Sequence, residues 1–138
     1  MESFDPLREV IDAQAALHGV WPNFHDAAVL SLTFEHGDVR PAENVFVGPA
    51  ITARIETRAM QRNLRLTLVF RDCGAIAMTG FDVDNEVLDI GFVREARGFF
   101  TDGVTPLPPL VRVAFVPAGA FRLDFTCFAI EARDTQSV

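Results

Sequence analysis

The sequence has no lysine and no tyrosine, and its aromatic residues are 13 phenylalanines and one tryptophan. The absence of lysine gives no indication of function, whereas the phenylalanine content predicts a core rich in this residue. Only two cysteines are present, Cys73 and Cys127, in strand-like segments that lack the spacing of metal ligands. We therefore expect both thiols to be reduced and to serve in packing.

Long apolar runs are also missing, since none approaches the roughly 20 residues that a membrane-spanning helix needs. Residues 1–6 are acidic without an apolar stretch, so we expect no secretory signal and a cytoplasmic protein. The net charge of −7, without a basic run, argues against nucleic acid as a partner. Glycine-rich phosphate loops and the G-x-S-x-G motif are absent, which removes two common types of active site.

The chain of 138 residues suits a single domain over 1–138. Asp5 and Pro6 are typical of a helix start and Gly19 of a helix end, which predicts a helix over about 6–18. The rest shows period-two alternation separated by turn residues, and no helical pattern lies between the strands. We expect a mainly β protein with an amino-terminal helix (α+β), built as a curved antiparallel sheet, sandwich or open barrel. About seven strands are predicted, at 28–36, 50–57, 63–71, 75–81, 86–94, 110–116 and 120–132.

Several finer features follow from the same alternation. Leu30, Leu32 and Phe34 are expected on one face of the first strand. The segment 64–81 is predicted to form a hairpin, and 39–49 a loop. The apolar phase slips after Phe125, which predicts a β-bulge near Cys127 or burial on both faces.

His25 and Asp26 are the first candidates for chemistry, because a histidine beside a carboxylate can act as a base with its orienting group. Adjacent residues of an extended segment point to opposite sides, however, so Asp26 is poorly placed to orient His25. The alternative is structural: Asp26 caps a turn, and His25 fills a polar site under the helix. Trp21 and Phe24 are expected to be buried between helix and sheet.

Two further sets of residues are candidates for metal-binding sites. The histidines His18, His25 and His36 are too widely spaced for a zinc site, and we expect no metal or other cofactor. The acidic stretch from Asp82 begins like a calcium loop, but valines stand where that loop needs glycine and glutamate. It is better explained as a polar turn between strands, containing Asp82, Asp84, Asn85 and Glu86.

Arginines on the outer faces of the predicted strands form a third set. They suit either an anion-binding surface or, more commonly, the solvated open face of a sheet. The residues are Arg54, Arg58, Arg65, Arg71 and Arg122.

The stretch 21–32 resembles the opening "P-x-F-H-D-A-E-V" motif of the immunity protein 50 family of small bacterial proteins. The stretch 81–88 is similar to that family's "F-N-x-x-N-V-I" segment, and 125–127 to its closing "F-x-C". The three matches occur in order and reach from about residue 20 to 132. Two departures are Ala28, where the family commonly has glutamate, and Glu86, which intervenes before the valine.

The family is assigned to the neutralisation of bacterial toxins, so the resemblance implies a protein-binding protein with a toxin as partner. We weigh this function against a small-ligand-binding protein or hydrolase with a His25/Asp26 site, and against a β-sheet domain that acts only in homo-oligomer assembly, such as a homodimer. An enzyme is the less favoured alternative. The candidate binding residues are Trp21, His25, Asp26, Asp82, Asp84 and Asn85.

Overall fold

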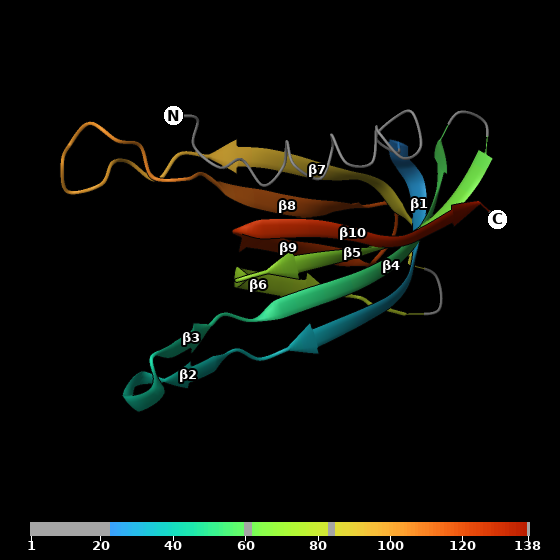
Figure 1. Ribbon diagram of the computed structural model, residues 1–138. Helices are drawn as coiled ribbons and strands as arrows, with labels where there is room; N and C mark the ends of the chain where they lie inside the picture. Colours follow the sequence, from blue (N-terminus) through green and yellow to red (C-terminus); the bar gives the residue numbers. More distant parts are fainter. Residues whose placement is uncertain (1–22, 60–61, 83–84, 138) are drawn as a thin grey trace.

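A computed structural model of the chain describes residues 23–59, 62–82 and 85–137 (Figure 1). The predicted helix over 6–18 and Trp21 lie outside these residues, so both stay predictions. The described part contains no α-helix, and its one helical element is the short 3-10 turn η1, Pro41–Glu43.

Ten strands build the described part, and every pairing between them is antiparallel. Sheet one has the order β1-β4-β5-β10, sheet two the order β6-β9-β8-β7, and β2 pairs with β3. The mainly β, antiparallel prediction is confirmed, and the described strands do not close into a barrel. The strands are β1 (Asn23–Glu35), β2 (Asp38–Arg40), β3 (Val45–Val47), β4 (Ala50–Ala59), β5 (Arg62–Arg71), β6 (Gly74–Thr79), β7 (Val87–Glu95), β8 (Leu110–Pro117), β9 (Arg122–Cys127) and β10 (Ala129–Ser137).

The core lies between the two sheets, because apolar residues alternate along the strands with the period of the pleat. On sheet one, Ile55 of β4 lies opposite Leu66 of β5, and both are buried. Phe70 from sheet one meets Phe125 from sheet two edge to face, with ring centroids 4.8 Å apart. The expected phenylalanine-rich core is therefore present, with Phe24, Phe70, Phe115, Phe121 and Phe125 all buried.

The prediction of a hairpin over 64–81 is wrong. β5 pairs with β4 and β10 in sheet one, whereas β6 pairs with β9 in sheet two. Asp72 and Ala75 have φ angles of 54° and 50°, and this left-handed backbone carries the chain from one sheet to the other.

A second crossing lies beside the first, between β9 and β10. The strand predicted over 120–132 is broken at Phe128, whose N–H donates to the carbonyl of Arg71 at 3.0 Å. The slip in the apolar phase near Cys127 thus marks a crossing between the sheets, which accounts for the exposed Phe128 next to the buried Cys127.

The loop predicted over 39–49 is also wrong, because β2 and β3 form a hairpin there, closed by η1 and by Asn44 at φ 57°. This hairpin is an extension of the β1–β4 pair. Figure 1 shows it projecting from the same end of the molecule as the connection between β7 and β8.

β1 departs from the expected alternation at Leu30, which is 42% exposed. The register of β1 against β4 shifts between Val29 and Ser31, so Leu30 occupies a bulge and Val29 enters the core. The regular alternation predicted from Leu30 through Leu32 to Phe34 is therefore interrupted at Leu30.

Candidate functional site

His25 and Asp26 lie on a wide bulge at the start of β1. Between Asn23 and Ala28 the chain advances five residues while β4 advances two, from Arg58 to Glu56. Asp26 adopts a φ of 58°, a left-handed conformation that aspartate tolerates better than most residues. The extra residues turn Phe24 and Ala27 into the core and leave His25 and Asp26 exposed.

The bulge overturns the expectation that the two side chains point apart. His25 Nε2 lies 3.5 Å from Asp26 Oδ2, and the two side chains are 64% and 69% exposed. His25 Nδ1 lies 2.8 Å from the carbonyl oxygen of Leu88 on β7. Because a carbonyl only accepts, Nδ1 donates this hydrogen bond, and Nε2 faces the Asp26 carboxylate. A histidine held beside a carboxylate in this way is a candidate for acid–base chemistry.

A shallow polar hollow of about 530 Å³ surrounds this pair. Its described lining mixes carboxylates, an arginine, an amide and a histidine, which suits a polar ligand and gives little apolar contact. The lining residues are His25, Asp26, Ala28, Glu56, Thr57, Arg58, Asn63 and Glu86.

Asn85 joins two elements near this hollow. Its side chain closes a turn on Asp82, because Asn85 Oδ1 accepts from the Asp82 N–H at 2.7 Å and Asn85 Nδ2 donates to the Asp82 carbonyl. The Asn85 carbonyl accepts from the N–H of Val29 at 3.1 Å. These contacts tie the segment before β7 to β1, as expected for a polar turn. Asp84 and Trp21, the other candidates, lie outside the described residues.

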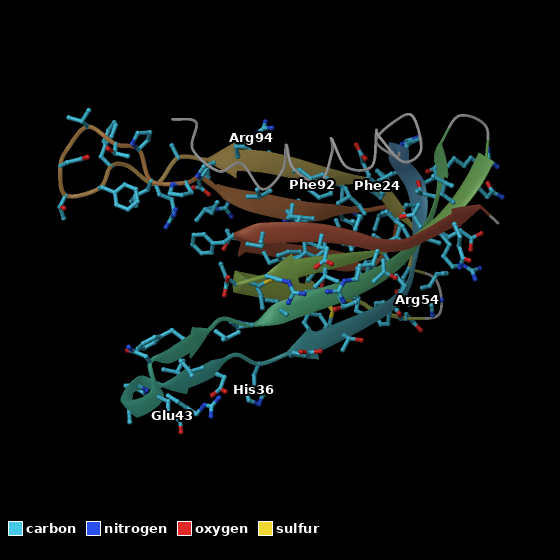
Figure 2. The ribbon with its side chains drawn as sticks, viewed as in Figure 1. Phe24, His36, Glu43, Arg54, Phe92 and Arg94 are labelled. Carbon is cyan, nitrogen blue, oxygen red and sulfur yellow. The ribbon has the colours of Figure 1, made fainter. Side chains whose placement is uncertain are left out.

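An aromatic contact in the core also holds the start of β1 against β7. Phe24 of β1 and Phe92 of β7 contact each other, with ring centroids 5.9 Å apart (Figure 2). The site therefore stands on a junction between the edge strands of the two sheets.

The two thiols take no part in this site. Cys73 and Cys127 are buried and free, and burial raises the pKa of Cys73 to about 11 and that of Cys127 to about 12. A thiol that keeps its proton is a poor nucleophile and a poor metal ligand. This environment agrees with the packing role expected for both residues.

Two projecting segments at the opposite end of β1 and β7 were not singled out as sites by the sequence. The β2–β3 arm, residues 38–47, exposes Val39 (67%), Phe46 (66%) and Val47 (55%). The β7–β8 arm, residues 96–109, exposes apolar side chains at Phe99 (60%), Phe100 (49%) and Val104 (78%). In 96–109 the available signal was the placement of phenylalanine and valine among prolines and glycines, and in 38–47 it was the placement of valine and phenylalanine among charged residues.

The β7–β8 arm has an ordered hydrogen-bonded structure. The N–H of Phe100 donates to the Thr105 carbonyl at 2.8 Å, and Asp102 accepts from the N–H groups of Val104 and Thr105 at 2.9 Å each. The hydrogen bond of the Thr105 hydroxyl, together with those from the N–H groups of Thr105 and Val104, holds the pKa of Asp102 below its usual value. At the base, the Arg97 guanidinium lies 4.6 Å from the centre of the Phe128 ring.

Within the described ranges, no three histidine, cysteine, aspartate or glutamate side chains are grouped so as to hold a metal ion. No helix in that part of the chain is long and apolar enough to cross a membrane.

Comparisons of the chain with protein-family models, with curated proteins and with solved structures found no match. The resemblance to the immunity protein 50 family therefore stays a prediction.

Proposed function

We propose that the protein is a cytoplasmic binding protein that neutralises a bacterial toxin by direct contact through its two arms. The observation that carries this proposal is the exposure of six large apolar side chains on two segments that project from one end of the molecule (Figure 1). Single exposed apolar residues are ordinary, but adjacent ones mark an interaction surface, and on the β2–β3 arm Val39 and Phe46 are cross-strand partners.

Aromatic residues give such a surface much of its binding energy. Phe46 is on one arm and Phe99 and Phe100 are on the other, and each keeps about half or more of its surface exposed for contact with a partner. Truncation of a central aromatic residue of an interface commonly costs about 2 kcal/mol or more.

Charged groups at the tips provide a polar rim. Arg40 on the β2–β3 arm pairs with Asp38 at 2.9 Å and with Glu43 at 2.7 Å, and Asp102 lies at the tip of the other arm. Figure 2 shows Glu43 at the far end of the β2–β3 arm. With a net charge of −7 on the chain, a toxin domain with basic residues around an apolar patch fits this end best.

The resemblance of the motifs at 21–32, 81–88 and 125–127 to the immunity protein 50 family supports a toxin as the partner. The test is rescue of cells that express a toxin domain encoded beside this protein, combined with co-purification of the two. We expect the wild type to rescue and to bind. The double variant Phe46→Ser/Phe99→Ser should weaken binding at least about 30-fold, which corresponds to about 2 kcal/mol.

Val93→Ser is the matched control, because Val93 is 61% exposed on β7 and belongs to neither arm. It should bind and rescue like the wild type. Undiminished binding by the double variant would contradict the role of the arms, and the lack of any toxin that the protein binds would contradict the neutralising function.

The hollow around His25 and Asp26 supports a second candidate, a small-ligand-binding protein or hydrolase. The described lining contains no serine or cysteine, so a hydrolytic reaction there would use water that loses its proton to His25 Nε2. His25→Ala separates the two candidates, because it should abolish such an activity and leave toxin rescue unchanged.

Homo-oligomer assembly is the third function to separate. β6 is an edge strand of sheet two with Ile76 and Met78 exposed, which offers an edge for pairing with a second copy. The molar mass in solution, measured by light scattering, tests this function directly. A dimer that the β6 variant Met78→Glu dissociates would support assembly through this edge.

A further inference from the structure

We propose that the outer face of sheet one binds a tetrahedral oxyanion, the phosphate group of a small molecule. The site is a hollow of about 450 Å³ that spans β4, β5 and β10. Its described lining residues are Arg54, Arg65, Thr67, Thr135 and Gln136.

Strand register brings these side chains together. Arg54 on β4 lies opposite Thr67 on β5, and Arg65 lies two residues before Thr67 on the same face. The two arginines are thus diagonal neighbours, whose backbones are about 7–8 Å apart. Ile55 and Leu66 alternate with them and are buried, so the arginines stand on the outer face.

A bulge in β10 adds the third wall. Between Arg133 and Gln136 the chain advances three residues while β5 advances two, from Thr67 to Arg65. Such a bulge bends its strand and changes the direction of side chains. It places Thr135 and Gln136 beside the arginines of the neighbouring strands.

The arginines have unused capacity to donate hydrogen bonds. Arg65 Nη2 donates to Glu56 Oε2 at 3.0 Å, but Arg65 Nε is buried and makes no hydrogen bond to any described group. Arg54 makes no ion pair with a described residue, although most other described arginines on the sheets do. The Nη atoms of the two guanidinium groups can therefore donate further hydrogen bonds to an acceptor in the hollow.

The lining selects the class of ligand. Two guanidinium groups, two hydroxyls and an amide offer more donors than the two oxygens of a carboxylate can accept, whereas a phosphate group presents three or four. The arginine fork also matches the geometry of phosphate oxygens. The volume leaves room for a small organic group attached to the phosphate.

Isothermal titration of the full chain with inorganic phosphate, glycerol phosphate and acetate tests this proposal. We expect saturable binding of phosphate with a Kd of about 1 mM or below. Arg54→Gln and Arg65→Lys should each weaken it at least about tenfold, the second because lysine keeps the charge but lacks the planar fork of donors that matches phosphate oxygens.

Arg112→Gln is the matched control, since Arg112 stands on sheet two, pairs with Glu95 at 3.1 Å and should leave the affinity unchanged. Tighter binding of glycerol phosphate than of inorganic phosphate would assign the site to a small phosphomonoester, and equal binding to free phosphate. Acetate that binds as tightly as phosphate, undiminished binding by Arg54→Gln or Arg65→Lys, or no saturable binding would overturn the proposal.

Discussion

Among the titratable groups that the structure describes, the two cysteines are those whose ionisation is most strongly altered by the fold. Burial raises the pKa from 9.0 to about 11 for Cys73 and to about 12 for Cys127. The chain has no lysine or tyrosine, and arginine stays charged well above this range. Ionisation of side chains between pH 9 and 11 is therefore confined to these two thiols.

Because only the two thiols ionise in this range, their raised pKa values predict how the stability of the protein changes at alkaline pH. Above about pH 9 the unfolded chain releases thiol protons that the folded chain keeps, so the free energy of unfolding falls as pH rises toward the folded values of about 11 and 12. Below pH 9 this contribution is fully present. Urea unfolding at pH 8, 9 and 10 should show the decline in the wild type, and the Cys73→Ala/Cys127→Ala variant should show little of it. An equal decline in both proteins would contradict the assignment.

The relative orientation of His25 and Asp26 could not be predicted from the sequence. The pair was found in the sequence, and the rule that neighbours in a strand point apart is sound for regular backbone. It fails here because Asp26 has a φ of 58° inside a wide bulge. The bulge depends on the pairing of β1 with β4 and on the contact of Phe24 with Phe92, which no local pattern contains.

At the scale of elements, several strands were readable because apolar and polar residues alternate along them, as from Leu64 to Leu68. Their partners were not readable. Asp72-Cys73-Gly74 suits a hairpin turn, yet the same residues carry the chain between sheets, since β5 already has two neighbours. The β2–β3 hairpin was missed because its strands have three residues each.

The crossing between β5 and β6 makes a prediction of its own. Ala75 has a φ of 50°, which costs an L-residue roughly 1–2 kcal/mol, whereas glycine adopts this conformation freely. Part of this gain is offset because glycine loses more backbone entropy than alanine on folding. Ala75→Gly should therefore raise the free energy of unfolding by up to about 1 kcal/mol.

Ala77→Gly is the matched control on the same strand, where Ala77 pairs regularly with Asp124. It should lower the free energy of unfolding by roughly 0.5–1 kcal/mol. Urea denaturation of both variants is the measurement, and equal losses of stability would show that the left-handed backbone at Ala75 is not a source of strain.

At the scale of the whole molecule, the two ends of the sandwich differ in character. One end holds the polar hollow around His25 and Asp26, where the segment before β7 is tied to β1. The other end carries the two arms with their exposed apolar side chains (Figure 1). The sequence predicted an antiparallel β protein and a candidate site at the His25 end, because His25 and Asp26 are adjacent in the chain, whereas the exposed apolar residues of the two arms are more than 50 positions apart.

Hydrogen–deuterium exchange of the protein with and without the proposed partner, a toxin domain encoded beside it, tests the proposed binding end most directly. We predict slower exchange of the amides in 38–47 and 96–109 on binding, and unchanged exchange in 23–28 and 85–90. Protection confined to 23–28 and 85–90, with both arms exchanging as in the free protein, would contradict the proposal.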